Sequence, residues 1–510
     1  MTPVRVRFAP SPTGPLHVGG LRTALYNYLL ARRTGGAFVL RIEDTDQKRY
    51  VPGAEDYIVE ALEWCGITPD EGPQQGGNYG PYRQSERREL YARHVQQLLD
   101  RGAAYYAFDT EEELNDRREQ EKAAGNHNFR YDAGTRMSMR NALSLPAAEV
   151  DRLLADGTPH VVRFRIDPGE TVRFTDTVRD AVSFRTDELG DQVLLKADGL
   201  PTYHLANIVD DHLMEITHVI RGEEWLPSTA LHVLLYRAFG WEAPTFAHLP
   251  LLLNPNGKGK LSKRHGAKFG FPVFPLRWED PAGGEVASGF REDGYLPEAL
   301  VNFLAFLGWN PGTEQEIFSL GELTAAFDLE RINKSGARFD IEKAQWYNQQ
   351  YLIGRPAAEL APLVQQQFAA AGHELSSGKA AAVAGLLKER IHLVPEFYTA
   401  GRYFVTAPDD YEEKTIRKKW KPDNRAKFDD LADRLAGLDD WSAPAIKAAV
   451  VAFMDANGLG FGAVLPILRV AVCGTVQGPD AFAVLATVGQ DESVARLRRG
   501  YDAFDAIKAA

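Results

Sequence analysis

The chain has 510 residues, of which 44% are hydrophobic and 10% aromatic, so it can bury several cores and is not expected to be a single domain. Its formal net charge of -12, from 58 basic and 70 acidic side chains, argues against a uniformly basic nucleic-acid-binding protein but leaves room for local basic patches. The two cysteines, Cys65 and Cys473, have no CxxC spacing, so neither a disulfide framework nor a structural zinc site is indicated, and a reducing compartment fits.

The N-terminal stretch 4–8 alternates as a strand does, with no charged-then-apolar signal sequence before it. No apolar run approaches the ~20 residues that a membrane span requires. The sequence therefore predicts a soluble cytoplasmic protein that does not contact a membrane.

The first part of the chain alternates strands and helices. The predicted order is strand, helix, strand and helix, at residues 4–9, 19–33, 38–42 and 54–65. The Pro/Gly-rich turn 10–15 follows the first strand, and the acidic turn 43–46 follows the second. This order is typical of the start of a doubly wound parallel sheet.

Residues 81–193 mix helices and short strands and are interpreted as an insertion. The alternation of strands and helices resumes at 193–196, passes 203–209 and 219–221, and gives a helix over 228–239, which would complete the sheet. From about residue 296 helical periodicity dominates. The predicted helices there cover 297–307, 357–371, 380–394 and 443–456.

The loop at residues 12–20 places His17 between a tight turn and a helix N-terminus, where free backbone N–H groups and the helix dipole attract phosphate. Taken alone, it is more simply a turn with an incidental histidine. The loop 258–265, KGKLSKRH, is flexible and cationic and can neutralise charge that develops on pyrophosphate. Taken alone, it is more simply a solvated run of charge.

Together the two loops resemble the signatures of the class I aminoacyl-tRNA synthetases. Residues 17–20, HVGG, correspond to the HIGH motif, and residues 260–264, KLSKR, correspond to the KMSKS motif. Within that class, five further stretches are similar to the bacterial glutamyl-tRNA synthetases, over almost the whole chain. They are RFAPSPTG at 7–14, RIEDTD at 41–46, GPYRQS at 80–85, TYHLAN at 202–207 and VIRGEEW at 219–225.

Three departures from the family pattern matter. The last position of the HIGH motif is Gly20 rather than His, which is common in this subfamily. Residues 105–109 stand where some members carry zinc-binding cysteines, so no zinc and no other bound metal site is expected. The segment 271–289 is longer than the family needs.

The resemblance implies an α/β plus α fold. A doubly wound, Rossmann-like sheet would carry an inserted α/β domain and be followed by all-α domains. The expected divisions are 1–82 and 194–255 for the two halves of the catalytic domain, 83–193 for the insertion that binds the acceptor end, 256–350 for the KMSKS loop and stem-contact domain, and 351–415 and 416–510 for two helical anticodon-binding domains.

The implied activity is ligation of L-glutamate to tRNA(Glu). ATP would activate the amino acid to glutamyl-adenylate, and the glutamyl group would pass to the 3′-terminal adenosine, releasing AMP and pyrophosphate. The carboxylate attacks the α-phosphorus in line, so the enzyme needs positioning and charge stabilisation rather than a nucleophile. Mg²⁺ would bridge phosphate oxygens. A monomer is expected, and the resemblance implies that activation waits for tRNA; charging of tRNA(Gln) is left open.

The resemblance also assigns roles to residues that line up with the family motifs. The expected catalytic residues are His17, Lys260 and Lys263. The expected ATP-binding residues are His17, Gly19, Gly20, Glu224, Leu253 and Lys263. The expected glutamate-binding residues are Arg7, Ala9, Ser11, Glu43, Tyr203, Asn207 and Arg221. Arg7 and Arg221 end strands at the sheet edge where ligands bind, and Glu43 would take the ammonium.

Simpler interpretations of these residues exist. An arginine at a strand end is commonly a surface ion-pair partner, and Glu43 could belong to a solvated acidic turn. For tRNA, Lys418 and Lys419 beside Trp420 suit phosphate contacts next to a stacking surface, although a solvated helix face is equally open. Arg390 lines up with a family position that reads the third anticodon base.

Other functions fit the sequence less well. A small-molecule nucleotidyltransferase with a similar first loop would not need about 200 helical residues after the second. A non-enzymatic RNA-binding module gives no reason for His17, Glu43 and Lys263 to coexist. A glutaminyl enzyme would be expected to end in β-barrels, and the truncated tRNA-modifying paralogue lacks the helical domains.

Overall fold

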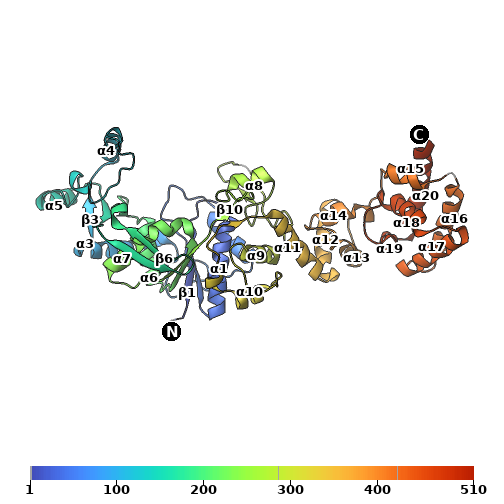
Figure 1. Ribbon diagram of the computed structural model, residues 1–510, viewed down its shortest axis with the longest axis horizontal. Coiled ribbons are helices and arrows are strands. Elements are labelled where there is room, and N and C mark those ends of the chain that lie inside the picture. Colours follow the sequence, from blue (N-terminus) through green and yellow to red (C-terminus); the bar gives the residue numbers. More distant parts are fainter. Residues whose placement is uncertain (1–2, 285, 422, 510) are drawn as a thin grey trace. The chain divides into compact units, whose positions relative to one another are not determined.

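The computed structural model describes residues 3–284, 286–421 and 423–509, except for the side chains of Lys263 and Ala267. The chain divides into two compact units. The first comprises residues 1–292 and 297–341, and the second comprises 293–296 and 342–510. Figure 1 shows the helices and strands of each. In the described part of the chain, no helix is long and apolar enough to cross a membrane.

A parallel sheet forms the centre of the first unit. Strand β1 (Arg5–Phe8) pairs in parallel with β2 (Ala37–Leu40), and β8 (His218–Gly222) pairs in parallel with β9 (Thr245–Leu249). The backbone N–H of Thr217 donates to the carbonyl of Arg5 at 3.0 Å, which joins β8 to β1. Helices α1 (Val18–Thr34), α2 (Ala54–Trp64), α6 (Tyr203–Leu213) and α7 (Leu226–Phe239) connect the strands. The predicted doubly wound sheet is confirmed.

Helix α1 shows how the sequence sets local structure. His17 caps its N-terminus, because the Nδ1 atom accepts the backbone N–H of Gly19 at 3.1 Å. Leu21, Leu25 and Leu29 repeat at four-residue spacing and are fully buried. The helix ends at Gly35, whose φ of 65° is left-handed and therefore favours glycine.

The strands of the inserted domain and of the central sheet are not separated at residue 193, the expected domain boundary. Strands β3 (Ala104–Ala107), β4 (Val161–Phe164) and β7 (Val193–Leu195) form a separate antiparallel sheet. The hairpin of β5 (Thr171–Asp176) and β6 (Asp180–Arg185) instead extends the central sheet, with Asp176 opposite Phe246 of β9. Residues 193–195 therefore belong to the inserted sheet, because strand alternation in a sequence does not identify the partner strand.

The remaining elements of the first unit surround these sheets. The helices are α3 (Arg88–Asp100), α4 (Glu111–Ala123), α5 (Ala147–Ala155), α8 (Lys263–Phe269), α9 (Pro297–Ala305) and α10 (Leu320–Ala326). The short strands are β10 (Leu252–Leu253), which pairs with β13 (Ala337–Arg338), and β11 (Trp278–Glu279), which pairs with β12 (Val286–Ala287).

The segment 271–289 has no physical role that the sequence predicts, and its first part, residues 271–276, packs against the start of α1. Phe271, Val273, Phe274 and Leu276 are buried. The backbone N–H of Val18 donates to the carbonyl of Val273 at 3.0 Å, and the ring of Phe274 meets His17 edge-on. This segment therefore connects the chain after the second signature loop to the first signature loop.

The second unit contains helices and no strand among its described residues, in agreement with the predicted all-α part. Its helices are α11 (Ile341–Gly354, whose first residue lies in the first unit), α12 (Ala357–Ala370), α13 (Ser377–Leu387), α14 (Glu396–Gly401), α15 (Glu413–Lys419), α16 (Asn424–Ala436), α17 (Ala443–Asn457), α18 (Phe461–Cys473), α19 (Ala481–Val488) and α20 (Gln490–Ala509). Helix α13 ends at Leu387, earlier than the predicted residue 394.

Candidate active site

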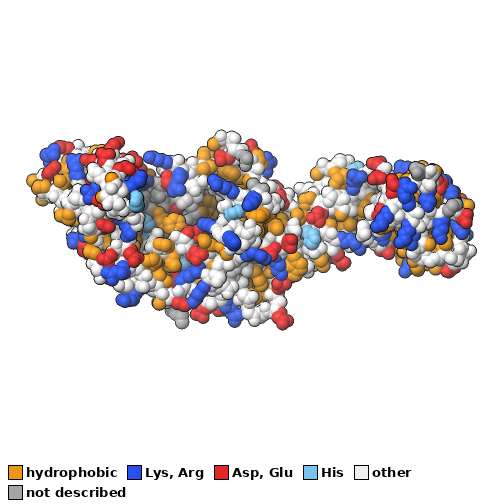
Figure 2. All heavy atoms as spheres, turned by 45° about the horizontal axis from the view of Figure 1, so that its top comes forward, with side chains coloured by type: hydrophobic (Ala, Val, Ile, Leu, Met, Phe, Trp, Pro, Cys, Tyr) orange, Lys and Arg blue, Asp and Glu red, His pale blue; other side chains and the backbone are white. Residues whose placement is uncertain are grey.

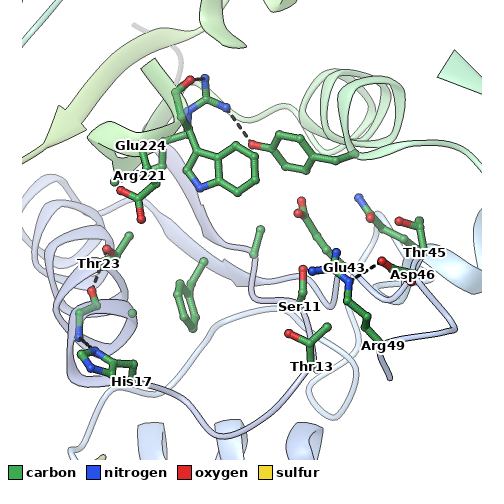
Figure 3. Close-up of a pocket in the computed structure, with 18 of the residues that line it drawn as sticks. Ser11, Thr13, His17, Thr23, Glu43, Thr45, Asp46, Arg49, Arg221 and Glu224 are labelled. Atoms are coloured by element: carbon green, nitrogen blue, oxygen red, sulfur yellow. Dashed lines mark hydrogen bonds and ion pairs between the residues drawn. The ribbon is translucent and has the colours of Figure 1, made fainter. Parts of the chain in front are cut away.

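A cavity of about 880 Å³ opens at the carboxyl ends of β1, β2 and β8, a size common for ligand sites. This is the sheet edge where ligands bind in open α/β folds. Figure 3 shows Ser11 and Glu43 on one side, His17 and Thr23 across from them, and Arg221 and Glu224 on a third side. The predicted site residues that line the cavity are Arg7, Ala9, Ser11, His17, Gly19, Gly20, Glu43, Tyr203, Arg221, Glu224 and Lys260.

Arg7 projects from the end of β1 and is only 4% exposed, so it is not a surface ion-pair partner. Its Nε donates to Asp211 Oδ1 at 3.0 Å, and its Nη2 donates to Asn207 Oδ1 at 3.0 Å. Its Nη1 makes no hydrogen bond to any described residue. Asp211 and Asn207 therefore fix the guanidinium of Arg7, and its Nη1 can donate to a ligand.

Glu43 is 8% exposed, which excludes a solvated acidic turn. Arg41 is fully buried beside it and donates to Glu43 Oε1 at 3.1 Å and to Asp211 Oδ1 at 2.8 Å. Burial raises the pKa of Glu43, outweighing the opposite effects of Arg41 and Arg7. Arg41 and Asp211, which contact Glu43 and Arg7, are not among the predicted site residues. The feature of the sequence that could have identified them is a charged side chain at a strand or helix position where the periodicity predicts a buried residue.

Arg221 leaves the end of β8 and is also buried. Its Nη1 donates to the hydroxyl of Tyr203 at 2.9 Å, and its Nη2 donates to Thr229 Oγ1 at 2.8 Å. Because the oxygen of Tyr203 accepts from Arg221, its own proton is available to another acceptor. Tyr203 lines the cavity, so that acceptor can be a ligand oxygen.

Two predicted contacts differ in the structure. Asn207 does not line the cavity; its side-chain oxygen accepts from Arg7 and Arg41, each at 3.0 Å, which leaves only its amide nitrogen for a substrate. Leu253 does not line it either, and Leu252 does. The side chain of Leu253 points toward Gly336, where an added Cβ would lie only 2.8 Å from Leu253 Cγ. This is expected because neighbouring residues of a strand face opposite sides, so that Leu252 faces the cavity and Leu253 does not.

The opposite side of the cavity suits a nucleotide. His17, Gly19 and Gly20 line it at the start of α1, where free N–H groups favour phosphate. With Nδ1 accepting from Gly19, neutral His17 carries its proton on Nε2 and can donate from there. Lys260 Nζ lies 2.7 Å from Glu224 Oε1 at the cavity wall. The side chain of Lys263 lies outside the described part of the chain, so its role stays a prediction.

The predicted tRNA-contacting residues of the second unit divide into exposed and buried ones. Lys418 and Arg390 are exposed, and Lys419 is half-buried. Trp420 is 2% exposed and donates from its indole to Asp505 at 2.7 Å. The prediction that Trp420 is a stacking surface is wrong in this arrangement, because its ring packs among Phe428, Tyr501 and Phe504.

This sheet and cavity, with one signature loop after the first strand and another after β10, define a class I aminoacyl-tRNA synthetase. Residues 3–346 match the family of class I tRNA synthetases (E and Q), catalytic domain, and residues 359–501 match the anticodon binding domain family. The chain is 54% identical to a glutamate–tRNA ligase of Phocaeicola vulgatus and to one of Porphyromonas gingivalis, covering 98% of each chain.

Two solved structures of glutamate–tRNA ligases are also similar to this chain. A glutamate tRNA ligase of Elizabethkingia meningosepticum in complex with its amino acid is 50% identical, with a TM-score of 0.95 over 98% of this chain and 99% of that one. A glutamate–tRNA synthetase of Elizabethkingia anophelis is 50% identical, with a TM-score of 0.94 over 98% of this chain and all of that one. The chain belongs to the glutamate–tRNA ligase family.

Proposed function

We infer that this enzyme activates L-glutamate with ATP to glutamyl-adenylate and transfers the glutamyl group to the 3′-terminal adenosine of tRNA(Glu), releasing AMP and pyrophosphate. The observation that carries this inference is the pairing, in one cavity, of a helix start for phosphate with buried Arg7, Arg221 and Glu43. The buried cations suit a carboxylate of glutamate, and the buried anion suits its ammonium.

In the first step, the α-carboxylate attacks the α-phosphorus and pyrophosphate leaves. No nucleophile of the protein is needed, so rate acceleration comes from position and charge. His17 and the N-terminus of α1 would hold the α-phosphate region. Lys260 and Lys263, on the second signature loop, would neutralise charge on the departing pyrophosphate. Glu224, Gly19 and Gly20 would line the nucleotide site, with Leu252 in the place expected for Leu253.

Glutamate would be held at the other side of the cavity. Glu43 would take the ammonium, and Ser11 and the backbone at Ala9 would complete its surroundings. Arg7 and the Tyr203–Arg221 pair would face the γ-carboxylate. Both groups present donors, which suits a carboxylate and leaves a γ-amide with its own N–H group facing a donor.

Mg²⁺ fits this arrangement as a partner of the nucleotide. The described residues contain no cluster of three or more His, Cys, Asp or Glu side chains that could hold a metal ion. Mg²⁺ keeps several waters and is commonly bound through substrate phosphates, so ATP oxygens would supply most of its ligands. The ion would then neutralise phosphate charge during the first step. Elemental analysis of the purified enzyme should find no stoichiometric zinc; one tightly held zinc per chain would contradict the expected absence of a zinc site.

In the second step, a ribose hydroxyl of the terminal adenosine attacks the carbonyl carbon of the adenylate and AMP leaves. The inserted sheet of β3, β4 and β7 would hold the acceptor end, since β7 is followed directly by Lys196 and Asp198, which line the cavity. The stem would contact the part around 256–350, and helices of 351–415 and 416–510 would contact the anticodon. We expect a cytoplasmic protein. We also expect a monomer, and sedimentation at several protein concentrations would check this oligomeric state.

The test is charging of separated tRNA fractions with labelled glutamate and labelled glutamine. Glutamate should be esterified to tRNA(Glu) with release of AMP and pyrophosphate, and glutamine should not. A preference for glutamine would contradict the proposed function. Charging of tRNA(Gln) with glutamate would extend it, and omission of tRNA from an ATP–pyrophosphate exchange assay would show whether activation waits for tRNA.

A further inference from the structure

Asp176 and His248 lie behind Arg221 and do not line the cavity. Asp176 is the last residue of β5, and His248 is in the neighbouring strand β9. Their side chains are fully buried, with His248 Nδ1 2.6 Å from Asp176 Oδ2. The other ring nitrogen, Nε2, lies 3.0 Å from Nε of Arg221 and 3.1 Å from Thr229 Oγ1. A continuous chain of hydrogen bonds therefore runs from Asp176 to Arg221.

The partners determine where the ring proton of His248 lies. A guanidinium group can only donate, so His248 Nε2 must accept from Arg221. The proton is then on Nδ1, which donates to Asp176. Burial lowers the pKa of His248 and, together with the nearby charge of Arg221, outweighs the opposing effect of the bond to Asp176, which agrees with a neutral ring.

The carboxylate of Asp176 cannot easily turn. Its Oδ1 accepts three backbone N–H groups, from Val178 at 2.9 Å, Arg179 at 2.9 Å and His248 at 3.2 Å. Only Oδ2 remains for the ring of His248. Burial acts to raise the pKa of Asp176, but the bonds from His248 and these N–H groups outweigh it and lower that pKa. Asp176 is thus a fixed acceptor on which the ring is aligned.

We infer that Asp176 and His248 are positioning residues that set the orientation of Arg221 and thereby the recognition of the γ-carboxylate of glutamate. His248 holds Nε, and Thr229 holds Nη2. With two edges of the guanidinium fixed, Nη1 lies 2.9 Å from the hydroxyl of Tyr203 on the cavity wall and 3.3 Å from Nδ1 of the buried His232. This inference rests on the proposed role of Arg221 in glutamate binding.

The contact between Asp176 and His248 also links β5 to β9, so the alternative is that the pair has a purely structural role. Such a role would lower stability and affect both substrates alike. A positioning role instead raises the KM for glutamate and leaves the KM for ATP unchanged, because the proposed ATP site lies at His17, Gly19 and Gly20, on the opposite side of the cavity. The ratio of the two KM values separates the alternatives.

Asp176→Asn is the informative variant because it keeps the shape of the side chain and replaces one acceptor oxygen with a donor N–H group. The three backbone N–H groups require the Asn oxygen on their side, so the Asn amide would donate toward His248 Nδ1. The ring would then carry its proton on Nε2, facing the N–H of Arg221, which is a donor–donor conflict. Nitrogen NMR of histidine-labelled enzyme should show this change of tautomer. The signal of His248 is assigned by its loss in His248→Gln.

In charging assays at saturating ATP and tRNA, Asp176→Asn should raise the KM for glutamate by about tenfold or more, and the KM for ATP by less than about twofold. The double variant Asp176→Asn/His248→Gln should recover most of this loss, because the Gln oxygen can accept from Arg221. An unchanged tautomer, an unchanged KM for glutamate, or an equal rise for ATP would each overturn the inference. Failure of the unaltered enzyme to charge glutamate would instead overturn the proposed function.

A second pair of variants decides the matter if Asp176→Asn does not fold. His248→Gln and His248→Leu both remove the bond to Asp176, and they differ at the atom that faces Arg221. His248→Leu should show a KM for glutamate at least about fivefold above that of His248→Gln, with equal KM values for ATP. Equal KM values for glutamate in the two variants would overturn the inference.

Discussion

The ammonium of Lys260 lies 2.7 Å from Oε1 of Glu224, which joins the second signature loop to the cavity wall at the proposed nucleotide site. Both side chains are well exposed, at 59% and 42%. An exposed ion pair of this kind contributes at most about 1 kcal/mol to stability. The pair is therefore better suited to hold the loop near the site and to be exchanged when a nucleotide arrives.

Glu224→Gln should separate these roles. The melting temperature should stay within about 2 °C of the unaltered enzyme, because a solvated pair is lost. The KM for ATP should change, since both the position of Lys260 and the cavity wall are altered. Lys260→Met is the matched control that removes the same pair from the other side and should also lower kcat. A large loss of stability with an unchanged KM for ATP would show that the pair is structural.

His17→Asn should slow charging by about 100-fold or more, because it removes a fixed donor near the phosphate at which charge develops. Asparagine is itself a good helix cap, so stability should be preserved. His17→Ala should lose as much activity and about 1 kcal/mol of stability as well, since the cap to Gly19 is gone. Near-normal turnover of either variant at saturating ATP would remove His17 from the mechanism.

The fold was predictable where one local pattern decides the structure. Helix α1 was expected at residues 19–33 and is Val18–Thr34, because its apolar row, its glycine stop and its capping histidine agree. The partner of a strand is a long-range property, which explains why β5 was assigned to the insertion although it pairs with β9. Helix α13 ends at Leu387 rather than 394, so Arg390 lies in a turn rather than on a helix.

The lining of the cavity was predictable at residues that motifs place beside strand ends, such as Arg7, Glu43 and Arg221. Residues that hold those side chains were not predictable, because Asp211 and His248 become relevant only when distant segments meet. Trp420 illustrates the opposite error: a tryptophan in a basic run suggests a stacking surface, yet an indole buries enough area to enter the core whenever a partner such as Asp505 accepts its N–H.

The run of basic residues on α15 gives a prediction for tRNA binding. Figure 2 shows Lys and Arg side chains gathered over the C-terminal helices. Changing Lys418 and Lys419 together to Ala should weaken tRNA binding and flatten its salt dependence by up to about two phosphate contacts. The KM for ATP should not change. Arg425→Ala is the control, because Asp429, Asp502 and Asp505 already neutralise Arg425. An unchanged salt slope in the double variant would return the run to an ordinary solvated surface.

The raised pKa of Glu43 predicts an acid limit to glutamate binding. Only the ionised carboxylate attracts the substrate ammonium, and burial moves its protonation to a higher pH than usual. As pH falls, kcat/KM for glutamate should therefore decline with an apparent pKa above about 4.5, the ordinary value for glutamate. Glu43→Gln should have a low kcat/KM without this decline. An equally steep decline in Glu43→Gln would assign the titration to another group.

Arg221 is predicted to distinguish the γ-carboxylate of glutamate from the γ-amide of glutamine. Its charge reaches the cavity through Nη1 and the hydroxyl of Tyr203, which together favour a group that only accepts. Arg221→Gln leaves the γ-carboxylate without this cation. An uncompensated buried charge costs about 3 to 5 kcal/mol, which corresponds to a loss of a few hundred to a few thousand-fold in kcat/KM for glutamate.

The same variant should keep ATP binding and narrow the ratio of kcat/KM values for glutamate and glutamine. Arg7→Gln is the paired control, since Arg7 is the other buried cation of the cavity and its Nη1 makes no hydrogen bond to the described residues. If Arg221→Gln keeps the original preference while Arg7→Gln loses it, the distinction belongs to Arg7. The hydrogen bonds of Arg221 to Thr229 and His248 would then position Tyr203 rather than the substrate.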